Sequence, residues 1–247
     1  MVEFLRDREA FSRLANSAHT RDNWYQIVNK ADDTAEIFIY SEIGWIGATA
    51  EEFVAELTEV TAENLNVRIN SYGGSVFDGI AIYNALRSHP AHVTTQVDAI
   101  AASIASVIAQ AGDHRVMMDS SEMMIHQATG IALGATAADM RELADILDTQ
   151  TEKIADIYAQ AKGDGRAKKR FLNLMSAGGS NMGTWLSPEE AVKEGLADEV
   201  KTPPKREKNV LPEVPEPSMN VSGTVDFSDL FDEEAYEWSL PDMEGAT

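Results

Sequence analysis

The sequence of 247 residues contains no cysteine. This absence excludes disulfide bonds, a thiol nucleophile and any metal site built on thiolates. The five histidines do not fall in a metal-ligand spacing, and no His-Glu-x-x-His motif occurs, so we expect neither a metal nor another cofactor. A chain without cysteine fits a cytoplasmic location, which we take as the expectation.

Long apolar runs are also missing. The longest, around residues 99–109, is too short and too rich in serine to span a bilayer, and residues 1–21 are too charged for a secretory signal peptide. Basic residues are scarce, since 20 lysines and arginines face 41 aspartates and glutamates and leave a net charge of −21. Phosphate binding needs clustered basic side chains, so we expect neither nucleic acid nor a membrane as a partner; the acidity is explained more simply by solubility.

Three regions differ in composition. Residues 1–22 are a charged N-terminal extension, and residues 203–247 are rich in proline and acidic residues with few apolar ones, which predicts a disordered tail. Residues 23–202 form the expected folded domain. Over the whole chain, 44% of the residues are hydrophobic, which is ordinary for a globular protein.

Within residues 23–202, short β-type runs alternate with segments of helical periodicity. Such alternation predicts βαβ units, a largely parallel sheet and an α/β fold. A capping box at Thr136 and Asp139 begins a helix that we expect to reach about Lys162, which is long for a globular protein. The expected strands are residues 24–28, 36–40, 67–70, 92–97, 116–118 and 123–125.

The most informative stretch is residues 97–126. Ser103 opens a helical run of small residues, and the N–H groups and dipole of a helix N-terminus favour developing negative charge. A serine hydroxyl needs a base to become a nucleophile, and His126 is the obvious one if the chain doubles back. The alternative is a buried small-residue helix, because one serine and one histidine do not establish catalysis.

A second stretch, residues 67–79, runs from a strand into the glycine pair Gly73-Gly74 and then into a helix. Paired glycines let backbone N–H groups approach a ligand closely. The N–H groups of Gly74 and Ile104 would then form an oxyanion hole beside Ser103. Taken alone, the glycine pair could equally serve only to reverse the chain.

Together these stretches resemble the ClpP-type serine peptidases, the proteolytic subunits of the Clp proteases. The resemblance spans residues 36–200 and departs from the family at Tyr72, where the family has proline. It rests on three motifs in order and at the family's spacing, followed by a closing helix and strand: Ile-Asn-Ser-x-Gly-Gly-Ser-Val (69–76), Ala-Ala-Ser (101–103), Met-Ile-His-Gln (124–127) and the segment 187–198.

The resemblance implies a ClpP/crotonase-like fold of repeated ββα units with a long handle-type helix. It implies Ser103 as nucleophile, His126 as base, and Gly74 and Ile104 as oxyanion hole, in a homo-oligomeric ring that cuts proteins or peptides. Residues 37–44 and Trp185 look most like bacteriophage members, which mature the prohead by cutting scaffold or capsid proteins. The location would then be the host cytoplasm or the prohead.

One feature departs from the family pattern. Gly183 stands where the family has Asp, or Glu in phage relatives, to hold the histidine. Between residues 163 and 187 the only acid is Asp164, which is poorly placed in the sequence. The amide of Asn181, a carbonyl or a water could orient His126 instead. We therefore expect weak activity that an acid at position 183 would raise.

Three alternatives remain open. A crotonase-type enzyme acting on CoA thioesters shares the architecture and the oxyanion hole but does not need Ser103 or His126. A catalytically weak or inactive ring-forming protein would explain Gly183. A serine–lysine peptidase is disfavoured because residues 65–150 contain no lysine.

Overall fold

The computed structural model describes residues 24–203, except 31–32, 45–47 and 179–182. The expected N-terminal extension, the chain after Pro203 and Asn181 lie outside the described residues, so the domain boundaries stay predictions. Among the described residues, no helix combines the length and apolar character that a membrane crossing requires.

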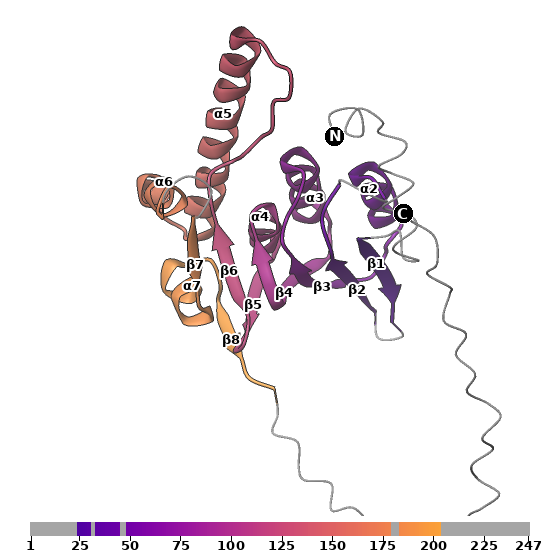
Figure 1. The fold of residues 1–247 in the computed structure, drawn as a ribbon. Helices are drawn as coiled ribbons and strands as arrows, with labels where there is room; N and C mark the ends of the chain where they lie inside the picture. Colours follow the sequence, from indigo (N-terminus) through magenta and orange to yellow (C-terminus); the bar gives the residue numbers. More distant parts are fainter. Residues whose placement is uncertain (1–23, 31–32, 45–47, 179–182, 204–247) are drawn as a thin grey trace, which may run out of the picture. The chain divides into compact units, whose positions relative to one another are not determined.

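The described part of the chain is built on one sheet of eight strands (Figure 1). The order is β1-β2-β3-β4-β5-β8, with β6 pairing to β4 and β7 pairing to β6. All pairs are parallel except β1–β2 and β6–β7, which confirms the predicted largely parallel α/β sheet. The strands are β1 (Tyr25–Asn29), β2 (Thr34–Tyr40), β3 (Asn64–Ser71), β4 (His92–Ala102), β5 (His114–Met118), β6 (Glu122–Ile125), β7 (Thr184–Leu186) and β8 (Glu199–Lys201).

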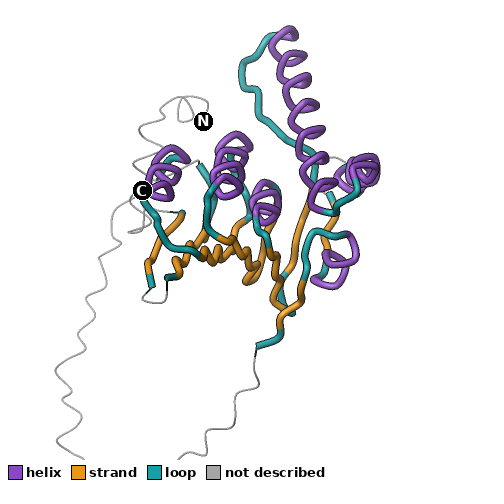
Figure 2. Tube along the Cα trace, turned by 180° about the vertical axis from the view of Figure 1, so that it is seen from behind, coloured by secondary structure: helices purple, strands orange, loops and turns teal. Residues whose placement is uncertain are grey.

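Helices α2, α3 and α4 lie side by side over one face of this sheet, as both views show (Figures 1 and 2). Helix α5 projects outward beyond them, and the predicted long helix is confirmed with Thr136 as its N-cap and Lys162 as its C-cap. The helices are α2 (Ala50–Thr58), α3 (Val76–Ser88), α4 (Ile104–Ile108), α5 (Ala137–Ala161), α6 (Lys168–Met175) and α7 (Pro188–Glu194), with 3-10 turns at Ala109–Ala111 and Gly165–Ala167.

The two faces of the sheet differ because side chains alternate along each strand. Ile37, Val67 and Thr95 occupy adjacent positions in β2, β3 and β4, and all three are buried beneath the helices. Their neighbours Arg68 and Gln96 lie on the opposite, partly exposed face. Alternation of this kind fixes the register, because a slip by one residue would expose the apolar set.

The parallel arrangement brings three strand ends together. Strands β3, β4 and β6 are parallel neighbours, so their carboxyl ends lie at one edge of the sheet. The residues that follow these ends are Gly73-Gly74, Ser103 and His126. The segments singled out in the sequence therefore converge at this edge.

Candidate active site

Ser103 sits on a strained turn between β4 and α4. Its backbone has φ 56° and ψ −128°, a conformation that residues other than glycine rarely adopt and that costs about 1–3 kcal/mol. The turn is held from one side by its own N–H, which donates to the carbonyl of Met124 at 2.9 Å. Strain of this kind persists only where the surroundings impose it, and it sets the direction of the serine side chain.

The turn is held from the other side by Gly73. A Cβ on Gly73 would lie 2.7 Å from the Cβ of Ser103 and 2.8 Å from the carbonyl oxygen of Ala102. The φ of +101° at Gly73 is likewise open mainly to glycine. Glycine at this position thus lets the turn after β3 pack directly on the turn that carries Ser103.

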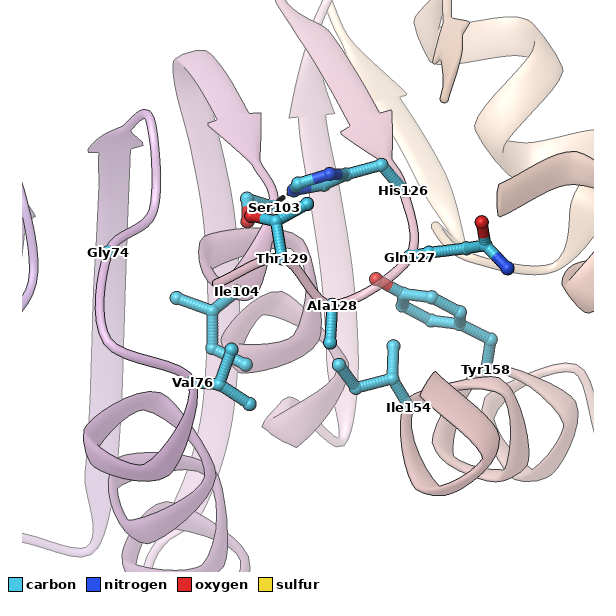
Figure 3. Close-up of a pocket in the computed structure, with 10 residues that line it drawn as sticks. All are labelled: Gly74, Val76, Ser103, Ile104, His126, Gln127, Ala128, Thr129, Ile154 and Tyr158. Atoms are coloured by element: carbon cyan, nitrogen blue, oxygen red, sulfur yellow. Dashed lines mark hydrogen bonds between the residues drawn. The ribbon is translucent and has the colours of Figure 1, made fainter. Parts of the chain in front are cut away.

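His126 follows β6 and faces Ser103 (Figure 3). Its Nε2 lies 2.6 Å from Ser103 Oγ, a hydrogen-bonding distance. Burial lowers the pKa of His126 below its usual 6.5, because the charged imidazolium loses hydration. The neutral ring, which can accept the serine proton, is therefore the form present at neutral pH.

Two backbone N–H groups flank Ser103. The backbone of Ile43 forms hydrogen bonds with both neighbours of Gly74: its N–H donates to Gly73 O at 2.8 Å, and its carbonyl accepts from Ser75 N at 2.9 Å. In a parallel bridge of this kind the N–H of the residue between them, Gly74, points away from Ile43. Ile104 is the first residue of α4, where a helix N–H has no partner within the helix. The two residues that the sequence singled out as an oxyanion hole thus border the same site.

These groups surround a cavity of about 30 Å³, enough for roughly two water molecules. Apolar side chains from α3 and α5, Val76 and Ile154, form part of its wall beside the polar pair (Figure 3). The complete lining is Gly74, Val76, Ser103, Ile104, His126, Gln127, Ala128, Thr129, Ile154 and Tyr158.

The other ring nitrogen of His126, Nδ1, is buried and has no hydrogen-bond partner within the described residues. Gly183 does lie beside the histidine, as its place in the family pattern implied, but its backbone passes too close for a side chain. A Cβ there would lie 2.2 Å from Ile125 O and 2.6 Å from His126 Cβ, on a backbone with φ +59°. The expectation that an acid at this position would raise activity therefore conflicts with the local geometry.

The remaining candidates for the third member are also placed. Asp164 Oδ1 accepts the N–H of Arg166 at 3.0 Å as the cap of a 3-10 turn, so this carboxylate is engaged elsewhere. Asn181 lies outside the described residues. Over the described parts of the chain, no group of three or more His, Asp or Glu side chains could hold a metal ion.

Two residues of the site were not identified from the sequence. Ser106 Oγ donates to the carbonyl of Ser103, and the hydroxyl of Tyr158 lies 2.8 Å from Ser106 Oγ. Tyr158 falls in the apolar stripe of α5, where it reads as a core residue. The hydroxyl of a buried tyrosine usually has a hydrogen-bond partner, and this rule could have indicated from the sequence that Tyr158 contacts a polar group.

Comparisons with known proteins point to the same family as the motifs. The Clp protease family model matches residues 19–204. The ATP-dependent Clp protease proteolytic subunit of Leuconostoc citreum is 34% identical over 160 residues, which cover 62% of this chain and 76% of that protein. The subunit of Deinococcus radiodurans is 32% identical over 160 residues, covering 61% and 73%, and subunit 1 of Leifsonia xyli is 27% identical over 168 residues, covering 64% and 81%.

The resemblance drawn from the motifs is thus confirmed at the level of the family. The fold, with its parallel sheet and long outward helix, is the one expected of that family. The chain therefore belongs to the Clp protease family and is a ClpP-type, serine-type peptidase.

Proposed function

We propose that the protein is a serine endopeptidase in which Ser103 is the nucleophile and His126 the general base. The observation that carries the proposal is the 2.6 Å contact between His126 Nε2 and Ser103 Oγ, made from a strained turn. Hydrogen bonding to a neutral imidazole is what activates a serine hydroxyl at neutral pH.

In this mechanism Ser103 Oγ bonds to the carbonyl carbon of the scissile peptide while its proton passes to His126 Nε2. The N–H groups of Gly74 and Ile104 bind the oxyanion that forms. The imidazolium then gives its proton to the leaving amine, and an acyl-serine remains. A water molecule, deprotonated by Nε2, releases the acid product and restores Ser103.

The histidine works without a carboxylate from position 183. Removing the third member of a catalytic triad typically lowers kcat by about 10⁴, yet a serine, a histidine and an oxyanion hole still act well above the background rate. We infer a slow peptidase in which the amide of Asn181 orients His126. Exchange of Asn181 for alanine should then lower kcat further.

We further propose that the protein assembles as a homo-oligomeric ring and acts in phage head maturation on scaffold or capsid proteins. The ring is supported by α5, whose outer half exposes Met140 and Ile146 at 53% and 40%. The phage role rests on the likeness of residues 37–44 and Trp185 to phage members. Host cytoplasm or prohead would be the corresponding location.

Labelling with a serine-reactive fluorophosphonate tests the nucleophile. The native protein should react and cleave a fluorogenic peptide, and Ser103→Ala should do neither. Ser121→Ala is the control, because it removes a serine hydroxyl from the turn between β5 and β6, away from His126. Cleavage by the Ser103→Ala protein would overturn the assignment.

A catalytically weak or inactive ring-forming protein is the second candidate. The Nδ1 of His126 favours it, because this atom has no partner among the described residues and a histidine without an acid beside it is a poorer base. Absence of both labelling and cleavage in the native, folded protein would establish this reading. Cleavage of a phage scaffold protein at defined bonds would instead support the head-maturation role.

A further inference from the structure

A chain of two hydroxyl groups lies behind Ser103. Tyr158 comes from α5 and Ser106 from α4, and their side-chain oxygens are 2.8 Å apart. Ser106 Oγ also bonds to the carbonyl oxygen of Ser103. Both residues are almost fully enclosed, with exposures of 1% for Tyr158 and 0% for Ser106, so bulk water has little access to these bonds.

The proton order in this chain follows from the groups involved. A carbonyl oxygen can only accept, so Ser106 must donate its single hydroxyl proton to Ser103 O. Ser106 Oγ is then left as an acceptor, and the hydroxyl of Tyr158 must donate to it. Burial raises the pKa of Tyr158 far above its usual 10, so the phenol keeps the proton that it donates.

The two hydroxyl groups lead to a peptide group that also carries one of the proposed oxyanion donors. The carbonyl of Ser103 and the N–H of Ile104 belong to the same peptide unit. That carbonyl accepts from Ser106 twice, from Oγ and from the backbone N–H at 3.1 Å. Hydrogen bonds to a carbonyl polarise the peptide and strengthen its N–H as a donor, by about 10–30% for each bond in the chain.

We propose that Tyr158 and Ser106 form a hydroxyl relay that strengthens the Ile104 N–H as the donor to the oxyanion. This inference rests on the proposed peptidase function and deepens it. Tyr158 is a positioning residue, since it acts through the Ser103–Ile104 peptide and touches no reacting atom.

The packing around Tyr158 separates the role of its ring from that of its hydroxyl. The ring lies against Phe171, with ring centroids 5.6 Å apart, and contributes to the core. Phenylalanine at position 158 would keep that packing and remove only the hydroxyl. Ser106 is anchored further by Gln110, whose Nε2 donates to Ser106 O at 3.0 Å.

The test compares Tyr158→Phe, Ser106→Ala and the double variant. Removing a direct oxyanion donor lowers kcat by about 10²–10³, so losing a 10–30% strengthening of one donor should lower kcat by about two- to eightfold. KM for the peptide should not change. Because the two hydroxyls act in series, the double variant should be no slower than the slower single variant.

A peptidyl aldehyde provides a readout that a merely structural role would not move. Ser103 adds to the aldehyde carbonyl and forms a hemiacetal whose oxygen occupies the oxyanion hole. In the Tyr158→Phe and Ser106→Ala proteins, the inhibition constant of the aldehyde should rise by the same factor by which kcat falls, while KM for the peptide stays unchanged.

Two matched controls report the loss of a hydroxyl from a buried residue elsewhere. Ser121→Ala removes a serine that donates to Met118 O at 2.7 Å, the same three-residue spacing as Ser106 and Ser103. Tyr83→Phe alters a buried tyrosine on α3. Neither change should affect kcat or the inhibition constant of the aldehyde.

Unchanged kcat and aldehyde inhibition in Tyr158→Phe and Ser106→Ala would refute the relay while leaving Ser103 as nucleophile. A change confined to KM, or losses that multiply in the double variant, would refute it as well. Cleavage by Ser103→Ala would overturn the proposed function itself. If Tyr158→Phe does not fold, Ser106→Ala carries the same test, because it only removes one small buried hydroxyl.

Discussion

Replacing Gly183 tests whether the position beside His126 can carry a side chain at all. Alanine there meets two costs. The left-handed backbone, with φ +59°, costs a residue with a Cβ about 1–2 kcal/mol. The contacts at 2.2 Å with Ile125 O and 2.6 Å with His126 Cβ force a backbone shift, which costs a further amount of about 1–3 kcal/mol.

Gly183→Ala should therefore lose about 2–5 kcal/mol of unfolding free energy. For a folded region of this size, the midpoint of thermal unfolding should fall by roughly 4–20 °C. Gly163→Ala is the matched control. Gly163 has a φ of +71° but nothing within 4 Å of its Cβ position, so it meets only the backbone cost.

Gly183→Asp shares the contact cost, although aspartate tolerates a left-handed backbone better than alanine. The shift presses on His126, and a displacement of about 1 Å at a catalytic group lowers kcat on the order of 100-fold. Calorimetry and peptide turnover measure both effects. A Gly183→Asp protein with an unchanged midpoint and a higher kcat than the native one would refute this reasoning.

Three further predictions follow from the site and its surroundings. Burial lowers the pKa of His126 below 6.5, so the neutral base persists as the pH falls through 6.5. The fall of kcat/KM on the acid side of its pH profile should therefore be centred below pH 6.5. A fall centred at or above that pH would contradict the role of His126 as the base. Gly79→Ala should reduce activity, because the new Cβ would lie 2.1 Å from Ile104 Cγ1. Gly165→Ala should not, because a Cβ at Gly165 meets open space. Equal peptide turnover by the two variants would contradict this prediction. Light scattering should give a mass several times that of one chain, and a monomer at micromolar concentration would exclude the ring.

Much of the fold could be predicted from local sequence. The capping box at Thr136 and Asp139 fixed the start of α5, because its hydrogen bonds involve neighbouring residues only. Alternation of apolar side chains indicated the strands, although β4 runs to Ala102 and the helix expected after Ser103 is α4 followed by a 3-10 turn. The convergence of Ser103 and His126 followed from the parallel sheet, which brings strand ends to one edge.

The rest of the site depends on contacts between distant segments. The left-handed backbone of Gly183 is set by its approach to Ile125, which no local pattern encodes. The bond between Ser106 and Tyr158 joins residues 52 positions apart and requires α4 and α5 to pack in one register. Periodicity assigns Tyr158 to the core, and it does not say that its hydroxyl has a partner.

The uneven burial of α5 has a consequence for amide hydrogen exchange. Its buried residues, Gln150, Thr151, Ile154, Ala155, Tyr158 and Ala159, all lie in the half near the sheet, while the outer half begins at a capping box and exposes Met140 and Ile146. In an isolated chain, the outer turns can open locally without breaking the contacts of Tyr158, so protection should rise from the tip to the base. Pairing of the tips between chains would flatten that gradient, and the exchange profile of this one helix would then report assembly at its outer end and the integrity of the active site at its inner end.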